Sequence, residues 1–139
     1  MNAAPDLRVA IIGSGFSGLC LGIHLKKAGI PFTILEKAEG LGGTWRDNTY
    51  PGAACDVPSH VYSFSFELNP DWSHSYSSGQ EIWDYCRRFA EKYDLIPRIR
   101  FGTEVRKAAF ENGRWQVLTA DGSRIEADVV VSGLGGLHL

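Results

Sequence analysis

A glycine-rich turn between a predicted strand and a predicted helix constrains the fold of this chain more than any other feature. Residues 13–18 read G-S-G-F-S-G, which matches the pattern G-x-G-x-x-G. The nearly continuous apolar run at residues 7–12 predicts a buried parallel strand before the turn. Residues 16–28 predict a helix after it, which Gly29 ends. A second strand at residues 32–35 completes a βαβ unit with parallel strands and a right-handed crossover.

The glycines of this turn, and the acid that follows it, are the residue types that a dinucleotide site requires. Gly13 permits the tight turn, Gly15 lets the backbone approach a pyrophosphate, and Gly18 lets helix and strand pack closely. The helix N-terminus offers free N–H groups and a positive dipole end to the anion. Glu36 ends the second strand, where a carboxylate accepts the ribose hydroxyls of adenosine. The pattern predicts dinucleotide binding, with an ordinary strand-to-helix turn as the alternative. It does not decide between FAD and NAD.

The middle of the chain combines a long irregular stretch with one helix. Residues 40–69 are rich in glycine, proline and aromatic side chains and show no long period. A structureless stretch of this length is uncommon in a compact domain unless it binds something. Residues 78–81 then match a capping box, which predicts a helix over residues 79–93.

The last third of the chain predicts an antiparallel meander. Asn-Gly and Asp-Gly pairs supply the positive φ angles of tight hairpins. They separate three short runs with β-strand signals at residues 103–110, 114–120 and 124–131. The predicted fold class is therefore α/β: one Rossmann-like domain over residues 1–139, with a parallel sheet, an inserted helix and a three-stranded antiparallel meander. The chain stops just after a buried parallel-type run and the glycine-rich loop that follows it. We therefore expect a fragment of a longer protein.

Composition and charge argue against several other classes of protein. The net charge is −2 and there is no basic stripe, so a nucleic-acid partner is not expected. No apolar run approaches the roughly 18 residues of a membrane helix, so no membrane partner is expected. The four histidines are scattered, and no metal site is predicted. The three cysteines, Cys20, Cys55 and Cys86, lack the density of a disulfide scaffold, which favours free thiols and a cytoplasmic location.

Five further motifs resemble a known family of flavoenzymes. They are G-G-T-W at residues 42–45, Y-P-G-A-A-C-D at 50–56, Y-S-F-S-F at 62–66, F-G-T-E-V at 101–105 and S-G at 132–133. Together they make almost the whole chain resemble the N-terminal part of the flavin-dependent Baeyer–Villiger monooxygenases. The resemblance implies FAD as the cofactor. One departure is Ala54, which stands where many relatives have arginine.

The resemblance also implies a role for each motif. The glycine turn would hold the FAD pyrophosphate, Glu36 the adenosine ribose, and the backbone of Val105 the adenine. Asp56 would lie near the isoalloxazine and act as a catalytic residue, meeting NADP and an arginine from a later part of the chain. The implied cofactor-binding residues are Gly13, Gly15, Phe16, Ser17, Gly18, Glu36, Lys37, Gly43, Thr44, Trp45, Asp56, Val57, Tyr62, Val105 and Gly133.

The residues alone leave two of these roles open. An aromatic side chain such as Trp45 offers a flat surface beside an isoalloxazine, but it could equally anchor the loop in the core. Asp56 could instead form a turn with Ser59 or cap a helix.

The activity that the resemblance implies has three parts. NADPH reduces FAD, the reduced flavin traps O₂ as a C4a-peroxide, and the peroxide oxygenates a ketone or a soft heteroatom of a small organic substrate. The NADPH site and the final strand of the FAD site would lie in segments after Gly133 that this chain lacks, so we expect the chain alone to be inactive. The alternatives are a non-catalytic FAD- or nucleotide-binding module, one polypeptide of a split flavoenzyme, and a plain NAD-binding Rossmann domain. The aromatic loop and the meander disfavour the last of these.

Overall fold

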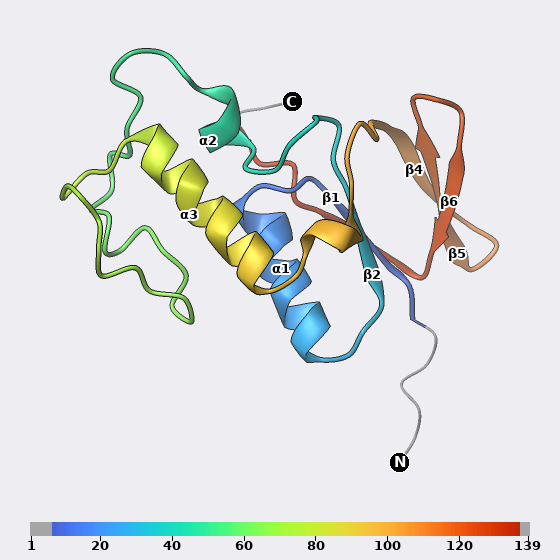
Figure 1. The fold of residues 1–139 in the computed structure, drawn as a ribbon. Helices are drawn as coiled ribbons and strands as arrows, with labels where there is room; N and C mark the ends of the chain where they lie inside the picture. The colour runs from blue at the N-terminus through green and yellow to red at the C-terminus, as the bar shows by residue number, and fades with distance from the viewer. Residues whose placement is uncertain (1–6, 137–139) are drawn as a thin grey trace.

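A four-stranded parallel sheet forms the centre of the computed structural model, which describes residues 7–136 (Figure 1). The predicted domain bounds also include residues 1–6 and 137–139, which lie outside the described residues. The strand order is β3-β2-β1-β7. The strands are β1 (Val9–Ile12), β2 (Phe32–Leu35), β3 (Ile99–Arg100) and β7 (Val129–Ser132). Ile11 of β1 pairs with Ile34 of β2 and Val131 of β7, so the predicted parallel unit is confirmed.

Two helices pack together with this sheet and form the core. They are α1 (Phe16–Lys27) and α3 (Gly79–Lys92), which lie next to each other in Figure 1. Leu19 and Ile23 of α1 are fully buried with Ile82 of α3 in one apolar cluster, together with the side chains of β1 and β2. The Nζ of Lys26 donates to the carbonyl of Tyr93 at 2.8 Å and joins the C-terminal ends of the two helices. Gly29 follows α1 with φ +70°, the conformation that a glycine after a helix supplies.

The start of α3 differs in one respect from the predicted capping box. The Oγ of Ser78 accepts a hydrogen bond from the Glu81 N–H, as predicted. The Glu81 carboxylate does not return to Ser78, because it accepts from the N–H and Oγ of Ser73 at 2.9 and 2.8 Å. Glu81 therefore connects the irregular segment to the first turn of α3.

A second sheet of three antiparallel strands confirms the predicted meander. Its strands are β4 (Val105–Glu111), β5 (Arg114–Thr119) and β6 (Arg124–Ala127), and it stands beside the parallel sheet in Figure 1. Asn112 and Gly113 take φ +53° and +80° between β4 and β5, as predicted, whereas in the Asp121-Gly122 pair between β5 and β6 only Gly122 has a positive φ, +86°.

The third predicted strand, residues 124–131, divides into two strands of different sheets. β6 ends at Ala127, and β7 begins at Val129 beside β1. Asp128 makes the change, because its N–H donates to the Arg8 carbonyl at 2.9 Å and its Oδ2 accepts from the Arg8 N–H at 2.8 Å. The sequence pattern predicts one continuous strand over these residues. Only the hydrogen bonds between Asp128 and Arg8 show where that strand divides.

Three short elements are absent from the sequence prediction. They are α2 (Thr44–Asp47), the 3₁₀ turn η1 (Ile96–Arg98) and β3. Each is four residues or shorter, too short for a periodic pattern to show. No helix in the described part of the chain is both long and apolar enough to cross a membrane.

Candidate functional site

The turn after β1 requires glycine at two positions. Gly13 has φ +97°, and a Cβ there would lie 2.8 Å from the carbonyl oxygen of Gly133. A Cβ on Gly18 would overlap the carbonyl oxygen of Gly13. The Gly133 N–H also donates to the Ile12 carbonyl at 2.8 Å. The first turn of α1, the end of β1 and the loop after β7 are thus in close contact at one point.

The N-terminus of α1 opens onto this turn without a side-chain cap. Gly15 is the N-cap residue, and no acidic side chain lies in the first turn. Helical N–H groups that no side chain caps can donate to an anion, which the helix dipole also favours. The arrangement suits the binding of a phosphate group.

Glu36, at the end of β2, is a buried carboxylate held by three protein donors. Its side chain is only 8% exposed. Oε2 accepts from the N–H and the Oγ of Ser14 at 2.8 and 2.6 Å, and Oε1 accepts from the Ala38 N–H at 2.9 Å. A carboxylate has about four acceptor sites, so Oε1 retains one for a ligand hydroxyl. Sequence reasoning missed Ser14, whose x position in the motif carries no signal of its own.

A second pair of glycines faces the first turn. The Gly42 N–H donates to the carbonyl of Ser14 at 3.0 Å. Gly43 has φ +53°, and a Cβ there would lie 3.3 Å from the Cα of Gly15. Thr44 then begins α2. The two glycine segments therefore lie opposite each other with only backbone between them.

Next to the two glycine segments, two aromatic side chains are joined by a hydrogen bond. The indole N–H of Trp45 donates to the phenol oxygen of Tyr62 at 3.0 Å. The ring of Phe16 packs on Tyr62 with centroids 5.1 Å apart. Burial raises the pKa of the Tyr62 phenol, and the indole donor opposes that shift only in part. The phenol therefore keeps its proton at neutral pH and can donate it to a ligand.

Most of the predicted cofactor residues line one cavity of about 680 Å³. Glu36 and Val105 are among its lining residues, as are Tyr62 and Asp56 from the irregular segment. The other predicted residues that line it are Gly13, Gly15, Phe16, Ser17, Lys37, Gly43, Thr44, Trp45 and Gly133. Gly18 and Val57 do not line it. Gly18 packs against Gly13, and Val57 packs against the apolar core.

Asp56 is an exposed residue at the cavity wall. The alternative in which it forms a turn with Ser59 finds no hydrogen bond among the described residues. The Oγ of Ser59 donates instead to the carbonyl of His74 at 2.9 Å and lies 2.7 Å from the Oγ of Ser77. Hydrogen bonds of the two buried serines therefore connect residue 59, close to Asp56 in the chain, with residues 74 and 77.

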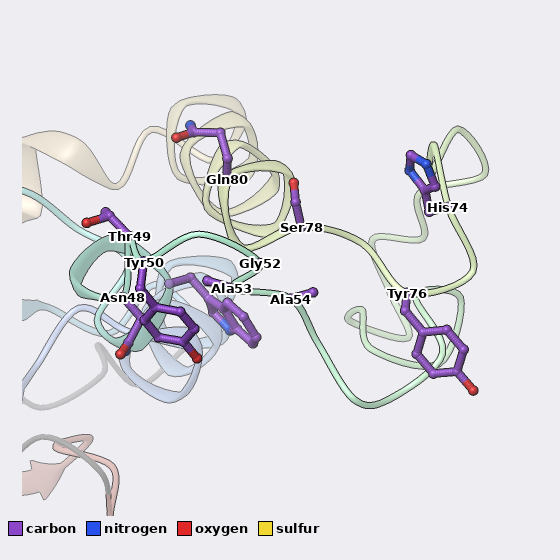
Figure 2. Close-up of a pocket in the computed structure, with 11 residues that line it drawn as sticks. Asn48, Thr49, Tyr50, Gly52, Ala53, Ala54, His74, Tyr76, Ser78 and Gln80 are labelled. Atoms are coloured by element: carbon purple, nitrogen blue, oxygen red, sulfur yellow. The ribbon is translucent and has the colours of Figure 1, made fainter.

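A second, more open cavity of about 450 Å³ adjoins the first. Figure 2 shows Asn48 and Tyr50 on one side of it and His74 and Tyr76 on the other. Trp45 and Tyr50 line both cavities. Tyr50 and Tyr76 are 62% and 55% exposed. Tyr76 is thus a surface side chain, whereas Trp72 is buried and Trp83 is half-buried.

Comparison with known proteins finds relatives that are similar in sequence and in fold. The family model described as "NAD(P)-binding Rossmann-like domain" matches residues 11–89. A Baeyer–Villiger monooxygenase of Streptomyces coelicolor is 49% identical over 134 residues, which are 94% of this chain and 26% of that protein. The chain spans about a quarter of the length of such relatives.

Two solved structures superpose closely. A steroid monooxygenase in its oxidized form, bound to NADP, matches with a TM-score of 0.86 and 38% identity, over 91% of this chain and 26% of the other. OTEMO in complex with FAD and NADP matches with a TM-score of 0.86 and 28% identity, over 96% and 26%.

Proposed function

Because the chain belongs to the family of NAD(P)-binding Rossmann-like domains and corresponds to about a quarter of a Baeyer–Villiger monooxygenase, we propose that it forms the FAD-binding part of a flavoprotein monooxygenase. One observation carries the proposal. A single cavity joins a buried ribose-type acceptor, an uncapped helix N-terminus between two glycine turns, and an aromatic wall. This order of groups fits adenosine, pyrophosphate and isoalloxazine in turn.

The residues present fit the cofactor. The cavity floor at Gly15 and Gly43 carries no side chain, which admits a pyrophosphate close to the backbone. Glu36 would hold the ribose, Val105 the adenine through its backbone, and Thr44 a phosphate or ribityl oxygen. Trp45 and Tyr62 would border the flavin ring. FAD supplies electron transfer and oxygen activation, while this chain binds the cofactor and orients it.

The activity of the whole protein belongs to the same proposal. The oxygenated substrate would be a small ketone or a soft heteroatom compound, with NADPH and O₂ as co-substrates. Asp56, at the exposed end of the cavity, would meet NADP and an arginine outside this chain. The three cysteines are free thiols, which favours a cytoplasmic location.

The direct test is reconstitution of the 139-residue chain with FAD. We expect one FAD to co-elute with each chain in gel filtration, with a flavin spectrum and quenched fluorescence, and NAD or NADP to bind more weakly. A chain that bound NAD in preference to FAD would instead be a plain nicotinamide-binding domain. FAD binding without NADPH oxidation fits both this proposal and the non-catalytic module. Adding the remaining part of the protein separates the two, because only the monooxygenase then consumes NADPH and O₂.

Replacing the ribose acceptor gives a second expected result. We expect Glu36→Ala to weaken FAD binding by about 1–3 kcal/mol, because hydrogen bonds to a charged acceptor contribute that much. The substitution also leaves the buried donors of Ser14 without an acceptor, so some loss of stability accompanies it. Calorimetry with AMP and 2′,3′-dideoxy-AMP isolates the ribose contact. The original chain should prefer AMP and the variant should not, and a preference that survived the substitution would exclude Glu36 as the acceptor.

A further inference from the structure

Trp83 lies behind the second glycine segment and does not line either cavity. It belongs to α3, and its indole N–H donates to the backbone carbonyl of Leu41 at 2.9 Å. The edge of the indole also meets Gly42, where a Cβ would lie 2.5 Å from Cδ1 of Trp83. Gly42 has φ +121°, a conformation that L side chains rarely adopt. Glycine at this position thus lets the loop lie directly against the indole.

One face of the indole is also in contact with a neighbour. The guanidinium of Arg87, one turn later on α3, lies 4.8 Å from the ring centroid of Trp83 and donates to Asp84 at 2.6 Å. Cation–π contacts of this kind are worth about 0.5–1 kcal/mol at exposed sites. The ring thus contacts the Gly42 backbone along its edge and Arg87 on a face.

The loop that Trp83 contacts also forms a hydrogen bond to the glycine turn at residues 13–18. The Gly42 N–H donates to Ser14, and Gly43 lies against Gly15. Residues 41–43 are therefore clamped between α3 and the glycine turn. Gly15, Gly42 and Gly43 all line the larger cavity, so the position of residues 41–43 sets the shape of the backbone wall against which a pyrophosphate would lie.

We propose that Trp83 is a positioning residue, which holds the Leu41–Gly43 backbone at the distance from Gly15 that the pyrophosphate and flavin half of FAD require. The inference rests on the proposed FAD site. It does not extend to the adenosine end, because Glu36 accepts from the N–H and hydroxyl of Ser14 and the N–H of Ala38, whereas the Gly42 N–H donates to the Ser14 carbonyl.

The test is the substitution Trp83→Phe in the 139-residue chain, which keeps an aromatic ring beside Gly42 and removes the N–H donor. We expect the dissociation constant for FAD to rise about 3- to 10-fold, the equivalent of one net hydrogen bond. The dissociation constant for adenosine should stay within about twofold, because adenosine carries neither the pyrophosphate nor the flavin that the clamp serves.

Trp72→Phe is the matched control. Trp72 is buried against Tyr85 of α3, but its indole N–H has no hydrogen-bond partner among the described residues, so loss of that N–H should change neither dissociation constant. Thermal unfolding of both variants shows whether each remains folded. Equal loss of FAD and adenosine affinity in Trp83→Phe would mean a purely structural role and would overturn the inference, as would unchanged FAD affinity. An original chain that binds no FAD overturns the proposed function itself, and the inference with it.

Discussion

The substitution Gly18→Ala is expected to abolish FAD binding and to lower the free energy of unfolding by about 3 kcal/mol or more. The new Cβ would overlap the carbonyl oxygen of Gly13, a backbone atom that cannot rotate away. Relief requires α1 to move from β1, and the turn between them would move with it. Urea denaturation measures the stability, and flavin fluorescence measures the binding.

Gly22→Ala on the same helix is the control. There the new Cβ would lie 3.2 Å from side-chain atoms of Ile34 and Phe32, which can shift by a few tenths of an ångström. The better helix propensity of alanine, worth about 1 kcal/mol, offsets that adjustment. We expect stability within about 1 kcal/mol of the original chain and unchanged FAD affinity. A Gly18→Ala variant as stable as Gly22→Ala would show that helix and turn are not packed as described.

Gly15→Val is expected to remove FAD binding while leaving the fold intact. Gly15 has φ −77°, which any residue adopts, and its Cβ would meet only the Cα of Gly43, at 3.9 Å. The added methyl groups of valine would instead occupy the space beside Gly15 in the cavity, where the pyrophosphate would lie against the backbone. We expect the affinity for FAD to fall by at least about 100-fold, close to 3 kcal/mol.

Alanine at the same position provides a graded comparison. Gly15→Ala adds one methyl group in ordinary contact with Gly43, so its FAD affinity should lie between those of the original chain and the valine variant. Both variants should unfold within about 1 kcal/mol of the original chain. FAD binding by Gly15→Val at the original affinity would place the pyrophosphate elsewhere and would contradict the proposed site.

Local patterns were sufficient for the parts of the fold that depend on neighbours in the chain. The strand, glycine turn and α1 follow from an apolar run, a motif and a helical period within residues 7–28, and the structure confirms all three. The hairpin at Asn112 and Gly113 was predicted for the same reason, because a turn type depends on the φ angles of two adjacent residues. The resemblance to Baeyer–Villiger monooxygenases likewise depended on short motifs, and the comparisons confirm it.

Contacts between distant residues decided the rest. The division at Asp128 depends on Arg8, which is 120 positions away. The orientation of the Glu36 carboxylate depends on hydrogen bonds from Ser14, and the position of the loop at Gly42 depends on Trp83. Neither Ser14 nor Trp83 has a sequence signal for its role. The sequence by itself therefore determined the βαβ unit, the meander and the residue types of a dinucleotide site, because local sterics and periodicity specify them. Only the tertiary structure decided which backbone segments close the cavity, because that depends on hydrogen bonds and packing between segments remote in the chain.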